Sequence, residues 1–242
     1  MVYSAKWITQ KGKLTQENRD YCAVALCGNK AIYVVVDGST KGSQSGVLAC
    51  EYSKALADQF VINAGFDTAA QLSALVNALS DKFKTIYPEG RLSFLVLLDA
   101  GNAAFYAIHA GDCRLGQVGL GNKIEWLSRP HTLANAVEDI SDECLAKHES
   151  RHTITRSFRP GRICEVEITP GPMPRQDKLI IATDGYWADL DTEKQAHFTN
   201  GVSGIQITPL DDTSCLLLSN SPNTSDCCIS IEGDDNFYLI KK

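Results

Sequence analysis

Five consecutive apolar residues, Phe94–Leu98, constrain more than any other feature what this chain can fold into. A strand with apolar side chains on both of its sides has to be covered on both faces. Two segments upstream can form one of the covers. The first, about Gln44 to Ala64, carries apolar residues at i+4 steps, and the second, about Thr68 to Tyr87, carries a 3.6-residue apolar stripe. We expect both segments to be helices that lie on a sheet.

The rest of the chain predicts mainly strands separated by short turns. Gly28-Asn29, between two β-rich runs, is a strong hairpin signal. The predicted strands are Cys22–Cys27, Ala31–Val36, Ser93–Leu98, Ala103–His109, Arg114–Val118, Lys123–Leu127, Ile163–Ile168, Lys178–Ala182, Thr213–Ser219, Cys227–Ile231 and Asn236–Ile240, and further helices are predicted at Asp142–Lys147 and Tyr186–Phe198. No linker or repeat divides them. We therefore expect a single domain over residues 1–242, with two packed sheets sheathed by helices.

Charge and cysteine content exclude several classes of protein. The 242 residues include 23 Lys+Arg and 29 Asp+Glu, a net charge of −6 with no basic block, so nucleic acids and anionic membranes are poor partners. Nine cysteines form no C-x-x-C pair, which argues against a zinc ribbon. No signal peptide is apparent, and no run approaches the ~18 apolar residues of a membrane helix. We expect a cytoplasmic monomer with reduced thiols.

Acidic residues gather where apolar strands end or begin. They are Asp37-Gly38, Asp112, Asp184-Gly185 and Asp211-Asp212. One Asp-Gly pair is usually ordinary turn chemistry, but several that each adjoin a buried strand favour a shared cluster of carboxylates. Such a cluster needs cations, because like charges a few ångströms apart repel each other strongly. Ligand sets made of oxygen atoms select Mg²⁺ or Mn²⁺.

Other catalytic signatures are absent or unconvincing. The sequence has no P-loop, no cysteine followed six residues later by an arginine, and no Gly-x-Ser-x-Gly elbow. His148–His152 matches the H-E-x-x-H pattern of zinc proteases, which requires both histidines on one face of a stable helix. Because the β-branched run Thr153–Thr155 follows at once, we expect a strand there and interpret the match as accidental.

Seven short motifs, in this order and spacing, resemble the metal-dependent type-2C serine/threonine protein phosphatase family (PPM) along nearly the whole chain. The segments that carry the resemblance are Asn18–Asp20, Val34–Gly38, Ala110–Arg114, Leu127–Thr132, His152–Arg156, Lys178–Trp187 and Asp211–Ser214. Each motif alone is weak. The resemblance implies an α+β fold, a four-layer α-β-β-α sandwich of two mainly antiparallel sheets, with two divalent cations in a cleft at one end.

The resemblance also implies roles for individual residues. Asp37 would bridge both Mn²⁺ or Mg²⁺ ions and Gly38 would offer its carbonyl. Asp184 and Asp211 would complete the first metal site, Asp20 would complete the second, and Asp112 stands at a family position that helps to hold a third ion. Asp37 and Asp184 would thus carry the catalysis. The reaction implied is hydrolysis of phosphoserine or phosphothreonine in a phosphoprotein, opposing a serine/threonine kinase, by a water molecule that the metals activate.

The sequence departs from the family at two places that concern phosphate binding. Thr15 stands where the family usually has a phosphate-binding arginine, and Ser39–Lys41 lacks the usual histidine after Asp-Gly. We expect Arg19 or Lys41 to substitute for the missing arginine. These departures leave an alternative function open, a catalytically weak or inactive phosphatase-like module that binds or regulates a partner. A metal-dependent protease is a third and more distant alternative.

Overall fold

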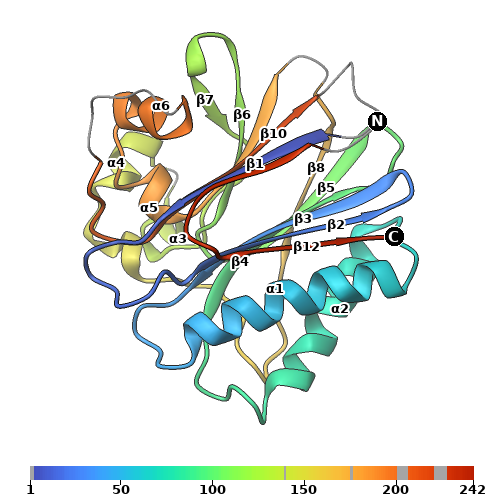
Figure 1. The fold of residues 1–242 in the computed structure, drawn as a ribbon. Helices are drawn as coiled ribbons and strands as arrows, with labels where there is room; N and C mark the ends of the chain where they lie inside the picture. Colours follow the sequence, from blue (N-terminus) through green and yellow to red (C-terminus); the bar gives the residue numbers. More distant parts are fainter. Residues whose placement is uncertain (1–2, 139, 175–176, 201–206, 221–227) are drawn as a thin grey trace.

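The computed structural model describes residues 3–138, 140–174, 177–200, 207–220 and 228–242, and its strands form two six-stranded sheets that lie face to face (Figure 1). One sheet has the order β11-β1-β10-β9-β6-β7, and its strands are Ile229–Gly233, Tyr3–Gln10, Thr213–Asn220, Lys178–Ala182, Arg114–Val118 and Ile124–Trp126. The other has the order β12-β2-β3-β4-β5-β8, with strands Phe237–Lys241, Asp20–Cys27, Lys30–Gly38, Leu92–Asp99, Ala104–Ala110 and Glu167–Pro172. Strands β11 and β12 pair in parallel, with β1 and β2 respectively, and the other pairings are antiparallel.

Strand β4 is covered on both faces, as its uninterrupted apolar run predicts. Phe94, Val96 and Leu98 face α1 (Ser45–Ile62) and α2 (Ala69–Phe83), whereas Leu95 and Leu97 face the opposite sheet. The period-two alternation of a strand thus divides one apolar run between two cores. Helix α2 begins with a capping box, in which Thr68 and Gln71 satisfy each other's backbone N–H groups.

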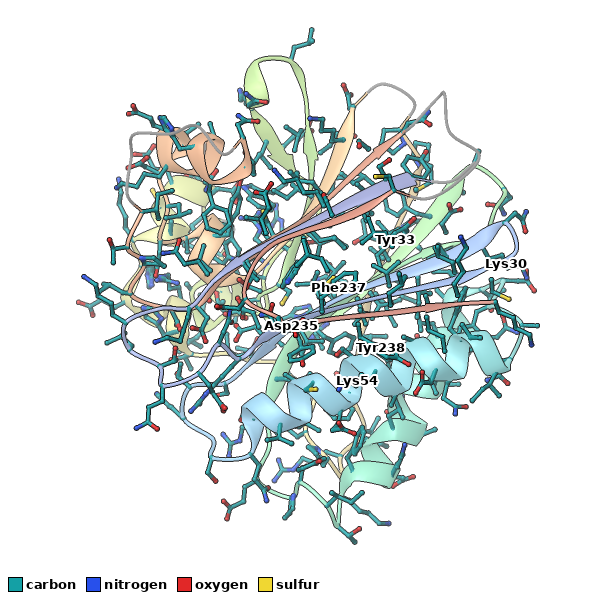
Figure 2. The ribbon with its side chains drawn as sticks, viewed as in Figure 1. Lys30, Tyr33, Lys54, Asp235, Phe237 and Tyr238 are labelled. Atoms are coloured by element: carbon teal, nitrogen blue, oxygen red, sulfur yellow. The ribbon has the colours of Figure 1, made fainter. Side chains whose placement is uncertain are left out.

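The edge strand β12 shows the same division (Figure 2). Phe237 packs into the core between the sheets, where Tyr33 also lies. The next residue, Tyr238, points to the helix side, where its hydroxyl donates a hydrogen bond to Asp58 of α1 at 2.8 Å. This contact joins the last strand of the chain to the first helix.

Short helices cover the outer face of the other sheet and complete four layers (Figure 1). They are α3 (Leu133–Val137), α4 (Asp142–Ala146), α5 (Asp184–Trp187) and α6 (Thr192–Asn200). The described residues also include two 3₁₀ turns, η1 (Leu120–Asn122) and η2 (Glu149–His152). Tyr186, Trp187 and Phe198 pack on the outward-facing apolar side chains of β9 and β10. The α+β sandwich expected from the sequence is confirmed. No helix in the described ranges is long and apolar enough to cross a membrane.

Three predicted elements were wrong in part. The helix predicted over Tyr186–Phe198 is two helices, because Asp191 accepts the N–H of Lys194 and starts α6 afresh. The strand predicted over Ile163–Ile168 begins only at Glu167 and continues past Pro170, since β8 is an edge strand and tolerates proline. The run Thr153–Thr155 forms a single bridge, Ile154 with Thr132, rather than a strand. Cys227, the predicted start of the strand after β10, lies outside the described residues.

Strand β1 is absent from the prediction. No strand was predicted for this segment, although Tyr3, Ala5 and Trp7 alternate with polar residues in the pattern of a half-buried strand. It lies inside its sheet, between β10 and β11.

Candidate metal centre

Antiparallel pairing brings the strand-end acids of both sheets to one end of the sandwich. In one sheet Asp20 opens β2 directly opposite Asp37 near the end of β3, and Phe94 of β4 pairs with Ala110, two residues before Asp112. In the other sheet Ala182 of β9 pairs with Cys215 of β10, so Asp184 and Asp211 lie just beyond the same edge. Strand ends hold these carboxylates on rigid elements.

Three of the acids form a compact group. Asp37, Asp112 and Asp184 each offer a carboxylate oxygen, and these oxygens all lie within 4.8 Å of one another. Asp112 is buried, whereas Asp37 and Asp184 keep some contact with solvent. The group is therefore partly buried but keeps some contact with solvent through Asp37 and Asp184. We call Asp37, Asp112 and Asp184 the acidic cluster.

Asp20 and Asp211 adjoin the acidic cluster. Asp20 is buried and accepts a hydrogen bond from the hydroxyl of Thr183 at 2.9 Å. Asp211 is half-buried, and its charge raises the pKa of all three members of the cluster. Gly38 ends β3, and its N–H donates to the carbonyl of Arg19 at 3.1 Å. Every acid predicted as a metal ligand thus lies in or next to the cluster.

Burial and mutual repulsion raise the pKa values of these carboxyl groups. The pKa of Asp37 lies well above its usual range because of burial first, and then because of Asp20, Asp184, Asp112 and Asp211. Burial likewise comes first in raising the pKa of Asp20, Asp112, Asp184 and Asp211. Without cations, such a group holds protons at a pH where exposed aspartates are ionised.

A divalent cation fits the donor atoms of this cluster. Its ligands are all carboxylate oxygens, the set that Mg²⁺ and Mn²⁺ prefer. In addition, Oδ1 of Asp112 is buried and has no hydrogen-bond partner among the described residues. A buried carboxylate oxygen without a partner is costly, and coordination to a cation would satisfy it.

Backbone contacts fix the positions of the acids. The indole N–H of Trp187 donates to the carbonyl of Asp112 at 2.8 Å, which ties α5 to the loop between β5 and β6. Gly111 in that loop has φ +112°, a conformation that side chains other than glycine rarely adopt. Gly185 packs so closely that a Cβ there would overlap the carbonyl oxygen of Asp212. The glycines beside the acids are therefore required by the local geometry.

Arg151, a residue that no sequence motif assigned to the site, reaches the acidic cluster. Arg151 of η2 donates from Nη1 to Oδ2 of Asp184 at 3.3 Å and from Nη2 to Oδ1 of Asp189. Its side chain is 10% exposed. The sequence offered no local signal for this pairing, because 33 residues separate Arg151 from Asp184 and the arginine sits inside the accidental H-E-x-x-H match.

The loop that carries Thr15 and Arg19 is held by a different acid, Asp212. Thr15 is buried, and its hydroxyl donates to Oδ1 of Asp212 at 2.7 Å. The backbone N–H of Arg19 donates to Oδ2 of the same carboxylate at 2.9 Å, and its guanidinium donates to the carbonyl of Ser39. Lys41 is exposed on the turn after β3. Asp212 thus holds the loop in which Thr15 stands at the position of the expected arginine.

The H-E-x-x-H match is not a helix. Residues Glu149–His152 form one 3₁₀ turn, and Nδ1 of His148 accepts the N–H of Ser150. The accidental interpretation of this match therefore agrees with its local structure.

A second group of potential metal ligands consists of His109, His131 and Glu167. The two imidazole rings stack in parallel, with 8° between their planes and 4.6 Å between their centroids. His131 lies 3.1 Å from Glu167, and the guanidinium of Arg156 lies beside both residues. Parallel rings do not direct their nitrogen lone pairs at one point, and each ring has a hydrogen-bond partner of its own, the carbonyl of Arg129 for His109 and Glu167 for His131. This arrangement is that of two structural histidines.

Solved structures, rather than sequence matches, relate this chain to known proteins. No protein-family model and no curated protein matches the sequence. The S. agalactiae serine/threonine phosphatase matches with a TM-score of 0.67 at 16% identity, over 90% of this chain and 100% of that chain. The phosphatase PstP/Ppp of Mycobacterium tuberculosis matches with 0.68 at 17% identity, over 90% and 99%. The PPM Ser-Thr phosphatase MsPP of Mycobacterium smegmatis matches with 0.66 at 20% identity, over 90% and 98%. These likenesses establish a common fold.

Proposed function

We propose that this chain, which has the fold of the bacterial PPM serine/threonine phosphatases, is itself a metal-dependent protein phosphatase that acts on phosphoserine and phosphothreonine. The observation that supports this most is the acidic cluster, three convergent aspartates with raised pKa values at one end of that fold. Shared fold alone does not imply shared chemistry, so the proposal depends on the site.

Asp37, Gly38, Asp184 and Asp211, together with Asp20, would hold two Mn²⁺ or Mg²⁺ ions. When bound, the ions would supply positive charge for the phosphoryl oxygens and lower the pKa of a water molecule. The protein's part is to keep the carboxylates converged on rigid strand ends. Asp37 is central to this arrangement, because each of the other four acids is near enough to raise its pKa by charge repulsion.

Several further features belong to the same proposal. The substrate would be a phosphoprotein, the product of a serine/threonine kinase. All the described cysteines are free, which supports a reducing cytoplasm as the compartment. We also propose that residues 1–242 act as one domain and as a monomer.

One observation favours the alternative, a binding or regulatory module with weak or no activity. Thr15 replaces the expected arginine and is committed to Asp212, so this loop presents no guanidinium from that position. A module of this kind could retain the fold and the metal cluster while binding phosphate weakly.

Hydrolysis of a phosphothreonine peptide decides between the two functions. We expect turnover that requires Mn²⁺, stops with a chelator, and falls at least about 100-fold in Asp37→Asn and Asp184→Asn, the size of effect seen when one charge-stabilising group is lost. Asp81→Asn, on the exposed surface of α2, is the matched control and keeps full activity. No metal-dependent turnover in the parent protein would overturn the enzyme proposal, and unchanged turnover in both Asn variants would overturn the site.

A further inference from the structure

Arg151 is held against the acidic cluster by the fold around it. Its 3₁₀ turn is fastened to the loop before α3, where the N–H of Leu133 donates to the carbonyl of Thr153 and the N–H of Thr155 donates to the carbonyl of His131, both at 2.8 Å. The turn itself closes with the N–H of Arg151 on the carbonyl of His148 at 3.0 Å. The guanidinium therefore reaches Asp184 from a fixed backbone rather than from a free loop.

The charge of Arg151 acts on the cluster as a metal ion would. Its guanidinium lies 3.3 Å from Oδ2 of Asp184 and also pairs with Asp189, so its positive charge offsets carboxylate charge at the cluster. In the described part of the chain, it is the one basic side chain that forms a salt bridge with a member of the cluster. Asp189, the second partner, is only 23% exposed, so the pair is shielded from screening by solvent.

The guanidinium also has donors to spare. A guanidinium carries five N–H groups in a planar fork, and the bonds to Asp184 and Asp189 use two of them. The fork geometry matches phosphate oxygens in pairs, which an ammonium group cannot do. The guanidinium of Arg19 donates to the carbonyl of Ser39, and Lys41 is exposed; neither forms a salt bridge with a member of the acidic cluster among the described residues.

We propose that the guanidinium of Arg151 has two roles at the acidic cluster. It occupies the side of the cluster beside Asp189 in place of a third metal ion, and it binds the phosphate of the substrate. This inference rests on the proposed function and deepens it. It relocates phosphate recognition from the loop around Thr15 to η2. A positively charged side chain at this place competes with metal ions for the carboxylates but attracts phosphate. Removing Arg151 should therefore strengthen metal binding and weaken phosphate binding.

The test combines Arg151→Ala with Arg151→Lys, and uses Arg162→Ala as the control. Arg162 lies exposed on the loop near α2, where its backbone N–H contacts Ser80, so the control removes the same charge away from the cluster. Titration calorimetry measures Mn²⁺ binding, and then inorganic phosphate binding to the Mn²⁺-loaded protein. Steady-state kinetics on the phosphothreonine peptide supply KM and kcat, and thermal unfolding checks the fold.

For Arg151→Ala we expect Mn²⁺ to bind about 10-fold more tightly or with one further ion per chain, because a competing charge is gone. Phosphate should bind about 10-fold more weakly, and KM should rise by a similar factor with a smaller change in kcat, as when one charge-assisted hydrogen bond is lost. Arg151→Lys should keep the metal binding of the parent protein but recover only part of the phosphate affinity. Arg162→Ala should change neither.

Two results would overturn the inference. One is Mn²⁺ and phosphate binding in Arg151→Ala that stays within twofold of the parent protein. The other is metal and phosphate binding that weaken together, which indicates a merely structural role. If Arg151→Ala does not fold, Arg151→Gln takes its place in the same measurements. If the parent protein hydrolyses no phosphopeptide, the proposed function fails, and the two binding titrations still decide the role of Arg151.

Discussion

At the scale of single residues, this molecule holds carboxylates so close together that they repel one another strongly when ionised. Asp37 is the extreme case, with four other aspartates raising its pKa in addition to burial. The folded chain therefore binds protons there that the unfolded chain releases. A raised pKa in an acid means that its ionised form opposes folding, so stability of the metal-free protein declines as pH rises from the ordinary aspartate value of 3.8 through the raised one.

Asp37→Asn should therefore stabilise the metal-free protein while weakening its response to metal. At pH 7 and in the presence of a chelator, we expect the free energy of unfolding to rise by about 1 kcal/mol or more, because two like charges a few ångströms apart repel by about that much even in water. Urea unfolding monitored by circular dichroism measures this. Asp81→Asn serves as the control, and a loss of stability in Asp37→Asn would contradict the repulsion.

His131 should give the opposite dependence on pH. Burial, followed by the neighbouring His109, lowers the pKa of His131 from 6.5 to about 4. The unfolded chain then binds the extra proton between these values, so the stabilisation is complete above pH 6.5 and is lost as pH falls towards 4, with a slope of up to about 1.4 kcal/mol per pH unit. His131→Gln should flatten this slope relative to the parent protein in chelator, and His152→Gln, at an exposed histidine, should not.

Most of the acids could be predicted from the sequence because they lie at, or within two residues of, the end of a recognisable strand; these are Asp37, Asp112, Asp184 and Asp211. Asp20 was predicted only from the resemblance to a family. Asp37 lies near the end of β3 and Asp184 follows β9 by two residues, so small errors in the strand boundaries do not hide either acid. Arg151 could not be predicted, because its partners depend on how a 3₁₀ turn packs against α5. The role of Thr15 was equally hidden, since its hydrogen bond to Asp212 spans 197 residues.

At the scale of elements, the site depends on where β9 ends and α5 begins. Asp184 opens α5, Trp187 closes it on the carbonyl of Asp112, and Gly185 packs on the backbone of Asp212. One helical turn thus sets the positions of acids from three separate segments. The predicted helix was too long at this point, because hydrophobic periodicity continues through Leu190 while the backbone stops and restarts at Asp191.

Gly185→Ala should disturb the whole centre through this turn. The added methyl group meets the carbonyl oxygen of Asp212, which is backbone and cannot rotate away. We expect a loss of about 1–3 kcal/mol of stability, typical of overpacking, together with weaker Mn²⁺ binding. Gly119→Ala, where a Cβ meets open space apart from a distant carbonyl, is the control. Parent-like Mn²⁺ affinity in Gly185→Ala would show that the turn does not position the acids.

At the scale of the whole molecule, two sheets that close face to face place their strand ends at one rim. The register pairs Asp20 with Asp37 in one sheet and Ala182 with Cys215 in the other. The core between the sheets holds these two sets of strand ends against each other. The layer order follows from the sequence, because the apolar run of β4 requires cover on both faces. The place of β1 beside β10 does not follow, since it pairs the two ends of the chain, and strand pairs so distant in sequence leave no local pattern.

The central claim is that this rim binds divalent cations through the acidic cluster, and calorimetric titration with Mn²⁺ tests it most directly. At pH 7 we predict two ions per chain with release of protons, weaker binding at pH 5.5 because protons compete for the raised carboxylates, and loss of at least one ion in Asp37→Asn but not in Asp81→Asn. Absence of saturable binding at pH 7, or unchanged stoichiometry and affinity in Asp37→Asn, would contradict the account.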